Sequence, residues 1–413
     1  MRILVVAEQY PWPAADGYRR RLDHMVKGLA KLGQVDVVAL HRPGTADPQD
    51  PGIPSVKANA VPVGPDAGLR KWFKTWVRSR FPRRVLGVDW TPAVEEISTV
   101  SSPGAPYDLV WYSHVDSWVG LERHIHARSA IVDFDNLENI ALRLRRKVPP
   151  RFAPGASPLS KVKVIARWLT SRAFDLVDER RWAKLQIRCA ESVDKVVVCS
   201  DLDVGRSGCP NAVAVGNGAD RPEAVHTDRL SLRSGTPTML FVGALDYEPN
   251  TEAMEWFVRD VFPAIRAQVP DASVRIVGRG SDLIAWTSEV DGVELVGSVP
   301  SIESELLNAD VSIVPIQVGA GTRLKVVEAL ANYIPMVTTT VGCEGIDLVD
   351  GTHGLIRDDA HSFAQACASL LTDGELRHEL AIGGAALFEE RYDWALIESR
   401  VADLARSVID TAC

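Results

Sequence analysis

Short, fully apolar segments recur along this chain of 413 residues, and stretches with helical periodicity separate them. The first apolar segment runs from Ile3 to Ala7, residues 22–32 then place apolar side chains at helical spacing, and a second apolar segment spans Val35 to Leu40. Strands that are apolar throughout are buried on both faces of a sheet, as parallel strands covered by helices are. The first 40 residues therefore predict a strand–helix–strand unit with a parallel sheet.

The same pattern restarts after Asn217-Gly218, so the sequence predicts an α/β protein with two successive doubly wound halves. A length of 413 residues also suits two domains. We expect an N-terminal domain over 1–212, a second domain over 213–394, and a last helix over about 395–413 that packs back on the first domain. Further strand segments are expected at 109–112, 130–132, 195–199, 238–243, 273–278, 293–297, 311–315 and 336–339.

Composition and cysteine usage favour a soluble cytoplasmic protein. Hydrophobic residues make up 46% and charged residues 24% of the chain. The six cysteines are scattered without a CxxC pair or a histidine cluster, which argues against a disulfide framework and a zinc site. The first apolar segment is too short for a signal peptide, and no 18-residue apolar run follows.

Charge is divided unequally between the two halves. Residues 1–200 carry a balance of +10 and residues 201–413 a balance of −18, so the halves are expected to face different partners. Residues 69–84 hold seven basic residues, four aromatic residues and no acid. This composition favours peripheral contact with an anionic membrane, and the alternative is a surface helix packed by its aromatic residues. No nucleic-acid-binding motif accompanies it.

The strongest chemical signal lies between residues 315 and 330. A glycine-rich turn follows a predicted strand and leads into a helix. Such a turn exposes backbone N–H groups and the positive end of the helix dipole, and Arg323 and Lys325 add positive charge, so the segment suits a diphosphate. Glu328 lies on the same helix face as Lys325, where it could accept hydrogen bonds from ribose hydroxyls. The alternative is an ordinary helix start with a solvated polar face.

This segment, Gly319-x-Gly-Thr-Arg-Leu-Lys-Val-Val-Glu-Ala-Leu-Ala, with Gly342 to Ile346 after it, resembles the nucleotide-sugar motif of glycosyltransferase family 4. It is most similar to the branch with exosortase-associated sugar transferases, and Phe241 to Asn250 resembles the motif that opens the second domain there. The resemblance implies a GT-B fold, in which two Rossmann-like parallel-sheet domains face each other across a cleft. It also implies retaining sugar transfer with no required metal and no cofactor beyond the nucleotide diphosphate sugar.

The resemblance also assigns residues to the donor site. Glu328 would hold the ribose, Lys325 and the amides of Gly321 and Thr322 would hold phosphate or the donor sugar, and the main chain of Val299 would meet the base. Gly243 would end the first strand of the donor domain beside them.

Two departures from the family pattern affect this assignment. Ala320 stands where the family commonly has a glutamate that reads the donor sugar, and the family's Arg and Lys after the Gly243 strand are missing. Arg323 is the expected substitute for the missing cations, because a diphosphate leaving group gains charge in the transition state.

In the first domain, the family's glycine loop corresponds to Gly17 with Arg20 beside it, close to donor and acceptor. His114 follows a predicted strand, and the resemblance implies that it hydrogen-bonds the donor sugar near the reacting carbon. Asp116 and Asp135 are candidates for binding acceptor hydroxyls. The alternatives are a solvated strand-to-helix turn and a structural histidine.

The predicted function is transfer of a sugar from a nucleotide diphosphate sugar to a small-molecule or lipid-linked acceptor, either a bacterial glycolipid or polysaccharide intermediate or a natural product. A catalytically silent nucleotide-sugar-binding protein is one alternative, which Ala320 favours. A Rossmann-type dehydrogenase is another, but the first strand has no GxGxxG after it. If activity did require a divalent metal, the Asp201/Asp203 or Asp133/Asp135 pairs would be the expected ligands.

Overall fold

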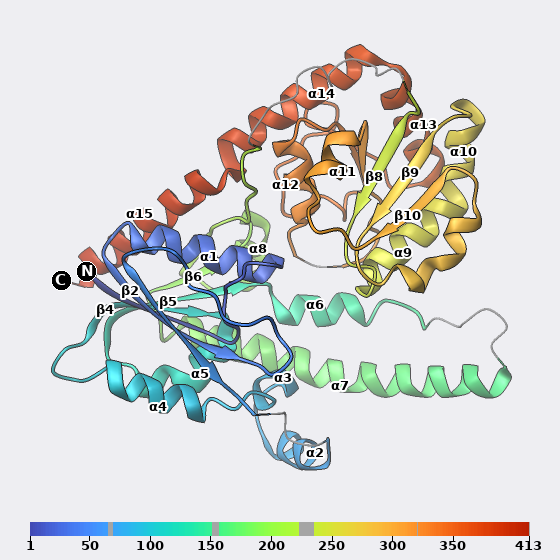
Figure 1. Ribbon diagram of the computed structural model, residues 1–413. Helices are drawn as coiled ribbons and strands as arrows, with labels where there is room; N and C mark the ends of the chain where they lie inside the picture. Colours follow the sequence, from blue (N-terminus) through green and yellow to red (C-terminus); the bar gives the residue numbers. More distant parts are fainter. Residues whose placement is uncertain (65–68, 151–156, 223–234, 320, 413) are drawn as a thin grey trace. The chain divides into compact units, whose positions relative to one another are not determined.

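The computed structural model describes residues 1–64, 69–150, 157–222, 235–319 and 321–412 (Figure 1). The chain divides into two compact units, each with its own parallel sheet. Unit 1 comprises Met1–Gly216 and Ala395–Cys413, and unit 2 comprises Asn217–Trp394.

Unit 1 is built on a seven-stranded sheet of parallel strands in the order β3-β2-β1-β4-β5-β6-β7. Helices α1 and α15 lie on one side of this sheet, and α4 and α5 lie on the other (Figure 1). Its strands are β1 (Arg2–Ala7), β2 (Gln34–His41), β3 (Val56–Pro62), β4 (Tyr107–Ser113), β5 (Ala127–Asp135), β6 (Lys195–Val198) and β7 (Ala212–Ala214). Its helices are α1 (Gly17–Ala30), α2 (Leu69–Arg78), α3 (Arg83–Leu86), α4 (Thr91–Val100), α5 (His114–Leu121), the 3-10 turn η1 (Glu122–His124), α6 (Glu138–Arg145), α7 (Pro158–Ala190), α8 (Asp201–Ser207) and α15 (Trp394–Ala412).

Unit 2 is built on a six-stranded parallel sheet in the order β10-β9-β8-β11-β12-β13. Its strands are β8 (Thr238–Val242), β9 (Ser273–Val277), β10 (Val293–Gly297), β11 (Val311–Val314), β12 (Met336–Thr338) and β13 (Leu355–Ile356). Its helices are α9 (Glu248–Trp256), the π turn η3 (Phe257–Val261), α10 (Phe262–Gln268), the 3-10 segment η4 (Ser281–Glu289), α11 (Glu303–Asn308), α12 (Leu324–Ala331), α13 (Ala360–Thr372), α14 (Gly374–Leu387) and the π turn η5 (Phe388–Tyr392).

Most of the apolar segments recognised in the sequence form inner strands of the two sheets, and β10 forms an edge of the second. The two parallel sheets confirm the predicted α/β fold class. All described side chains of β1 after its first residue are buried, and β11 is buried throughout. Each unit has a large apolar core around these strands. The sequence did not reveal β3, because this edge strand is largely half-exposed and lacks a continuous apolar run.

Both sheets reverse their strand order at one place, and this positions the candidate sites. In unit 1 the chain builds outward from β1 to β3 and then returns to place β4 on the other side of β1. In unit 2 it builds outward from β8 to β10 and returns to place β11 beside β8. Ligands of doubly wound sheets bind beyond the carboxyl ends of the two strands at such a reversal. His114 follows β4, and Gly243 follows β8.

Segment 69–84 folds into α2, a turn and the start of α3, and part of it packs in the interior of unit 1. The indole of Trp76 is buried and donates from Nε1 to Asp178 at 2.8 Å, and the guanidinium of Arg181 lies over its ring. Arg83 also pairs with Asp178. Trp76 and Arg83 are therefore not available for the membrane contact predicted for this segment. The side chains of residues 69–73 lie outside the described part. No described helix is long and apolar enough to cross a membrane.

Helix α15 docks on α1 in unit 1 through a close approach at Gly28. A Cβ atom at Gly28 would lie 2.7 Å from the carbonyl oxygen of Glu398 and 2.9 Å from Cβ of Val401. The carboxylate of Glu398 also accepts from His24 Nδ1 at 2.9 Å and pairs with Lys31 at 3.1 Å. The last helix is therefore fixed to the first helix by backbone proximity and by charge.

Replacement of Gly28 by Ala should destabilise unit 1 by about 1–3 kcal/mol, because the added methyl group must push α15 away from α1. Gly205→Ala is the matched control, since nothing lies within 4 Å of a Cβ atom at this helical position. The control should be neutral or stabilising by roughly 0.5–1 kcal/mol. Chemical denaturation monitored by circular dichroism measures both. Equal stability of the two variants would contradict this docking.

Candidate functional site

A single guanidinium organises the carboxyl end of the unit 1 sheet. Arg84 donates from Nη2 to Glu8 at 2.6 Å and to Nδ1 of His114 at 2.8 Å. Its Nε lies 3.2 Å from a carboxylate oxygen of Asp116, and its Nη1 donates to Glu138. These partners come from the end of β1, from α5 and from α6, so Arg84 joins three parts of the fold at the point where the strand order reverses.

His114 adopts a backbone conformation that is uncommon for residues other than glycine. Its φ angle is +68°, and that of Asp135 is +53°. Among the described residues other than glycine, only these two and Tyr333 have positive φ angles. Such conformations are strained and concentrate at functional sites. Nε2 of His114 lies 3.5 Å from Asp135, so the two strained residues face each other.

The protonation of His114 is set by its neighbours. Burial lowers the pKa of the imidazole, but Asp135 and Glu8 raise it more strongly, and the net pKa lies above the ordinary value. A guanidinium can only donate, so Nδ1 accepts from Arg84 and the proton of the neutral ring lies on Nε2, on the side of Asp135. Tyr18 packs edge-on against the ring with its centroid 4.9 Å away. The imidazole is therefore held in one orientation and one tautomer.

Asp116 does not line the cavity beside His114. The residue is 1% exposed and lies behind Arg84, and one of its carboxylate oxygens has no hydrogen-bond partner among the described residues. Burial raises the pKa of Asp116 to about 7, with Arg84 opposing this effect. Asp116 thus supports Arg84, in place of the predicted contact with acceptor hydroxyls.

Asp135 is half-buried, and its carboxylate contacts groups in the interior of unit 1. Its carboxylate accepts from the thiol of Cys199 at 3.2 Å and lies 3.6 Å from Nε of Arg21. Burial raises the pKa of Asp135, but the interactions with His114 and Arg21 lower it to a net value well below the usual range. A carboxylate that stays ionised beside the histidine fixes the direction of the imidazole proton.

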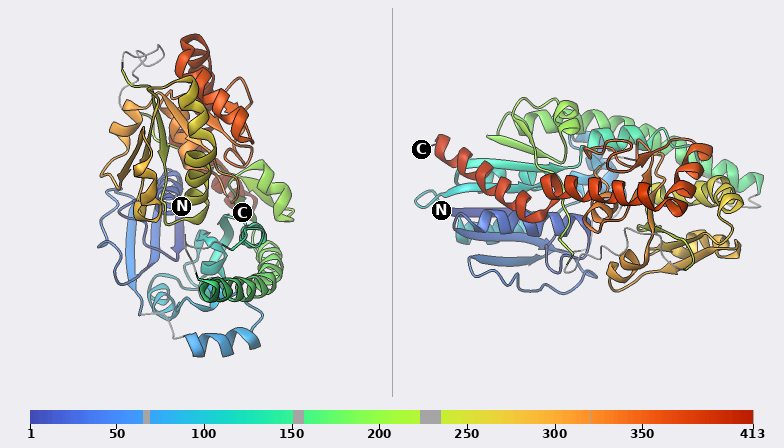
Figure 2. Two further views of the ribbon diagram at one scale, coloured as in Figure 1. Left: turned by 90° about the vertical axis from the view of Figure 1, so that its right-hand side faces the viewer. Right: turned by 90° about the horizontal axis from the view of Figure 1, so that it is seen from above.

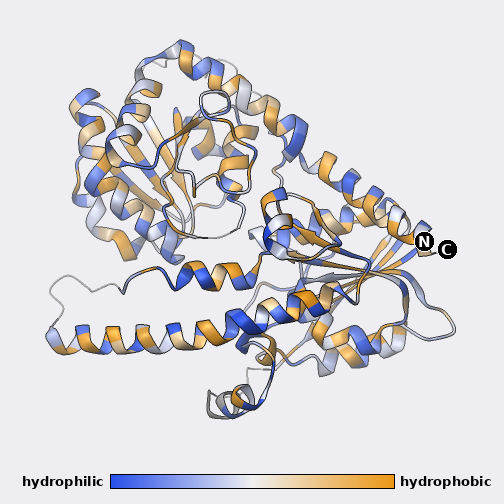
Figure 3. Cartoon of the chain, turned by 180° about the vertical axis from the view of Figure 1, so that it is seen from behind, coloured by the Kyte–Doolittle hydropathy of each residue, from blue (hydrophilic) through white to orange (hydrophobic). Residues whose placement is uncertain are grey.

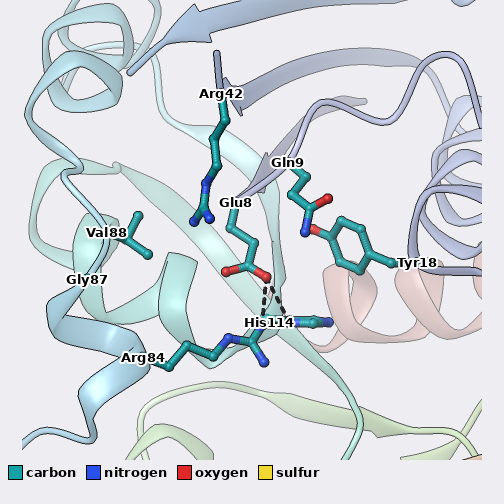
Figure 4. Close-up of a pocket in the computed structure, with 8 residues that line it drawn as sticks. All are labelled: Glu8, Gln9, Tyr18, Arg42, Arg84, Gly87, Val88 and His114. Atoms are coloured by element: carbon teal, nitrogen blue, oxygen red, sulfur yellow. Dashed lines mark hydrogen bonds and ion pairs between the residues drawn. The ribbon is translucent and has the colours of Figure 1, made fainter. Parts of the chain in front are cut away.

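A cavity of about 490 Å³ opens at this end of unit 1 (Figure 4). It combines two guanidinium groups, one carboxylate and one imidazole with an apolar wall. The side chain of Arg42, which follows β2, points toward the carboxylate of Glu8 in the close-up (Figure 4). The lining residues are Glu8, Gln9, Tyr18, Arg42, Arg84, Gly87, Val88 and His114. The cavity suits a polar molecule that carries hydroxyl or anionic groups.

The glycine loop before α1 behaves differently from its prediction. Gly17 begins α1, but the N-cap position is filled by Asp16, whose carboxylate accepts from the amide of Arg19 at 2.9 Å. Arg21 is buried and makes a bidentate pair with Asp133 at 2.9 and 3.0 Å. The three arginines therefore do not form one basic face, since Arg21 is buried while Arg19 and Arg20 are half-buried.

Glu8, His114 and Asp116 are of the residue types that ligate metals, and their ligand atoms lie within 4.8 Å of one another. The guanidinium of Arg84 already contacts all three. A divalent cation in the same place would meet a fixed positive charge, so these residues fit an arginine-bridged ionic cluster better than a metal centre.

The second candidate site lies in unit 2, around the ammonium group of Lys325. This group donates to Oδ1 of Asn250 at 3.0 Å and lies 3.9 Å from the ring centroid of Phe241. A Cβ atom at position 243 would lie 2.7 Å from it, so only glycine leaves this room. Gly243 and Lys325, which the sequence placed in the donor site, are thus brought together by β8 and α12.

Lys325 lacks a carboxylate within ion-pair distance in the described part of the chain, although Glu328 acts on it from one helical turn away. Burial and the charge of Arg323 lower the pKa of Lys325 to about 7, and the charge of Glu328 opposes this shift. The hydroxyl of Thr322 is buried without a hydrogen-bond partner among the described residues. An ammonium without a counter-ion and an unsatisfied hydroxyl are complementary to an anion that accepts hydrogen bonds.

The other residues predicted for the donor site also lie in unit 2. Gly321 has a φ angle of +85°, which turns the chain into α12, while Arg323 is buried against Gly319. Glu328 is half-buried on α12, so the segment does not form a solvated polar face. Val299 is half-buried against the core of unit 2, near the end of β10. Ala320 lies outside the described residues.

Comparison with known proteins finds a family match in the unit that carries this second site. Residues 236–373 match the family model described as glycosyl transferases group 1. This range lies within unit 2.

Among curated proteins, the chain is similar to the phosphatidyl-myo-inositol mannosyltransferase of Mycolicibacterium smegmatis, with 28% identity over 210 residues, 48% of this chain and 51% of that protein. It is also similar to an uncharacterized 44.6 kDa protein in the cps region of Klebsiella pneumoniae, with 27% identity over 38% of this chain and 42% of that protein. The chain therefore spans about half the length of these two relatives.

Solved structures of glycosyltransferases share the whole fold. Sucrose-phosphate synthase from Thermosynechococcus elongatus superposes with a TM-score of 0.69 at 20% identity and covers 100% of both chains. HepE of Anabaena in complex with UDP superposes with a TM-score of 0.61 at 12% identity and covers 98% of this chain and 100% of that one. The two parallel-sheet units of this chain therefore have the GT-B fold.

Several residues of the two sites were missed in the sequence. Glu8 directly follows the first apolar segment, and strand-end position alone could have identified it. Arg42 follows β2 in the same way. Arg84 was assigned to a basic surface segment, because nothing local in the sequence shows that it turns inward. Arg279, after β9, pairs with Asp246 at 2.8 Å, and its backbone carbonyl accepts from Leu245 at 2.7 Å.

The pKa of Lys325 leads to a pH-dependent affinity for diphosphate. An anion beside Lys325 favours the charged ammonium and raises its pKa, so binding takes up a proton above about pH 7. Affinity for inorganic pyrophosphate should then fall as the pH rises from neutral, by at most about tenfold per pH unit.

Lys325→Arg is the control, because arginine stays charged and the ligand's own titration is unchanged. Calorimetry in buffers of different ionisation enthalpy measures both proteins. Identical proton uptake by wild type and Lys325→Arg would contradict the assignment of Lys325 to the anion site.

Proposed function

We propose that this protein is a retaining glycosyltransferase that moves a sugar from a nucleotide diphosphate sugar to an acceptor. The observation that carries the proposal is the ammonium of Lys325, which donates to Asn250 beside Gly243. It lies at the strand reversal of the unit that matches the glycosyl transferases group 1 model. HepE, which shares the fold, has been solved with UDP and with UDP-glucose, and this favours a uridine nucleotide as the first donor to test.

The proposed donor contacts lie in unit 2. The ammonium of Lys325 and the hydroxyl of Thr322 would bind the diphosphate, with the amide of Gly321 beside them. Glu328 would accept hydrogen bonds from the ribose. The charge of Lys325 would then stabilise the diphosphate as it leaves, which is where negative charge develops in the transition state.

The reacting end of the substrates would be held by the cavity of unit 1. His114 is fixed in one tautomer by Arg84 and Asp135, so it can make a directed contact with the donor sugar near the reacting carbon. The acceptor would occupy the space lined by Gln9 and Arg42. Arg42 favours an acceptor that carries an anionic group, which is compatible with both a lipid-linked and a small-molecule acceptor.

The competing functions differ in what they need from these residues. A silent nucleotide-sugar-binding protein would need the Lys325 ammonium to bind the diphosphate, but it would not need a histidine held in a strained backbone conformation. A dehydrogenase needs a dinucleotide loop after β1, where this chain has Glu8 and Gln9. The five described cysteines are buried free thiols, as is common in the reducing cytoplasm, where nucleotide sugars are available.

Turnover of nucleotide diphosphate sugars tests the proposal directly. In a panel of UDP-, GDP-, ADP- and TDP-sugars, one donor should be hydrolysed slowly and transferred faster when the acceptor is present. His114→Ala should lower kcat about 100-fold, because positioning is lost. Glu328→Ala should weaken donor binding by roughly 1–3 kcal/mol.

His124→Ala is the matched control, since this histidine is exposed in the same unit. Binding of a nucleotide sugar without any turnover would favour the silent protein. Copurified NAD would favour the dehydrogenase.

We propose that turnover needs no divalent metal. Arg84 occupies the space among Glu8, His114 and Asp116, and the carboxylate of Asp133 is taken up by Arg21. Activity should therefore survive EDTA undiminished. Loss of turnover in EDTA with recovery on addition of Mg²⁺ or Mn²⁺ would refute this, and would point to the Asp201/Asp203 pair or to a metal held by the donor diphosphate.

A further inference from the structure

The N-terminal half of α7 carries an unusual number of exposed apolar side chains. Leu159 is 68% exposed, Val162 61% and Leu169 55%, and Ile165 and Leu176 are also exposed. Every residue from 161 to 167 is exposed. Figure 3 shows hydrophobic residues along the length of this helix. Single exposed apolar residues are ordinary, but a cluster of this kind marks an interaction surface.

These apolar residues share one face of the helix. Val162, Ile165, Leu169 and Leu176 follow at spacings of three, four and seven residues, which places them in one stripe along α7. The opposite face is exposed over residues 161–167 and becomes buried in unit 1 further along the helix, at Asp178 and Trp182. Helix α6 lies alongside α7 in Figures 1 and 2, and the stripe stays exposed beside it.

Charge around the first half of α7 is of one sign. Residues 139–174 contain nine Lys and Arg and no Asp or Glu. Arg143, Arg145 and Arg146 pair with Asp175 and Glu179, which lie further along α7. Four of the nine bases lie on the first half of α7 itself, at positions 161, 163, 167 and 172.

We propose that the stripe on α7 and its flanking bases dock the protein on an anionic membrane surface. A helix with an apolar face and basic flanks lies in the interface of a membrane, where its apolar side chains enter the acyl boundary and its bases meet anionic headgroups. A second copy of the chain would oppose one strongly basic segment to another, so the charge favours lipid over self-association.

This surface replaces the one expected at residues 69–84. In that segment Trp76 is buried, and Arg83 and Arg84 pair with carboxylates inside unit 1. The membrane contact moves to α7, where apolar and basic side chains are exposed together. The inference rests on the surface alone and does not depend on the proposed enzymatic activity.

Co-sedimentation with vesicles tests the proposal on the full-length protein. Binding to phosphatidylcholine vesicles that contain phosphatidylglycerol should exceed binding to phosphatidylcholine alone and should weaken as salt rises. Lys163→Gln/Arg167→Gln should weaken binding on the order of 25-fold, since each base near an anionic surface contributes roughly fivefold. Val162→Gln/Leu169→Gln should weaken vesicle binding by at least about tenfold. It should also reduce the binding that remains at high salt.

Lys57→Gln/Arg128→Gln is the control, with two exposed bases on β3 and β5 exchanged for the same residue. All variants replace exposed residues, and circular dichroism verifies that they fold. Equal binding of the α7 variants and the control, or no preference for anionic vesicles, would overturn the proposal. Sedimentation velocity measures self-association separately, and a dimer that dissociates in Val162→Gln/Leu169→Gln would overturn the proposal by assigning the stripe to a second copy.

Discussion

The guanidinium of Arg84 compensates the charges that unit 1 gathers at the end of its sheet. Four ionisable groups surround it, and each would be costly to bury alone. Burial raises the pKa of Glu8, but the charges of Arg84 and His114 lower it more strongly, so Glu8 remains an anion. The orientation of His114 depends on this cation, which Asp116 supports and which also pairs with Glu138 of α6.

Unit 2 shows the opposite arrangement at its own strand reversal. Lys325 rests on the ring of Phe241 and on an amide oxygen, with no carboxylate at ion-pair distance in the described part. Its lowered pKa expresses the cost of holding this charge without a counter-ion. Unit 1 therefore holds a completed ionic cluster, whereas unit 2 holds a cation that an incoming anion would complete. This difference supports the proposal that the diphosphate of the donor binds in unit 2.

The sequence predicted the architecture well, because buried parallel strands leave continuous apolar segments that can be read directly. The resemblance to glycosyltransferase family 4 also assigned Gly243 and Lys325 to one site, and the structure brings them together. Arg84 and Arg21 could not be assigned in this way. Both looked like surface bases, and only the long-range packing of α3 and α1 against the sheet turns them inward toward Glu8 and Asp133. The apolar stripe of α7 was missed for a related reason, since the spacing of its residues does not reveal whether another element covers that face.

A crystal structure with a bound nucleoside diphosphate is the most direct test of the donor site in unit 2. We predict the diphosphate within hydrogen-bond distance of the Lys325 ammonium and the Thr322 hydroxyl, with the ribose hydroxyls on Glu328. A diphosphate bound at the Gly17 loop of unit 1, with Lys325 still resting only on Asn250, would contradict this assignment.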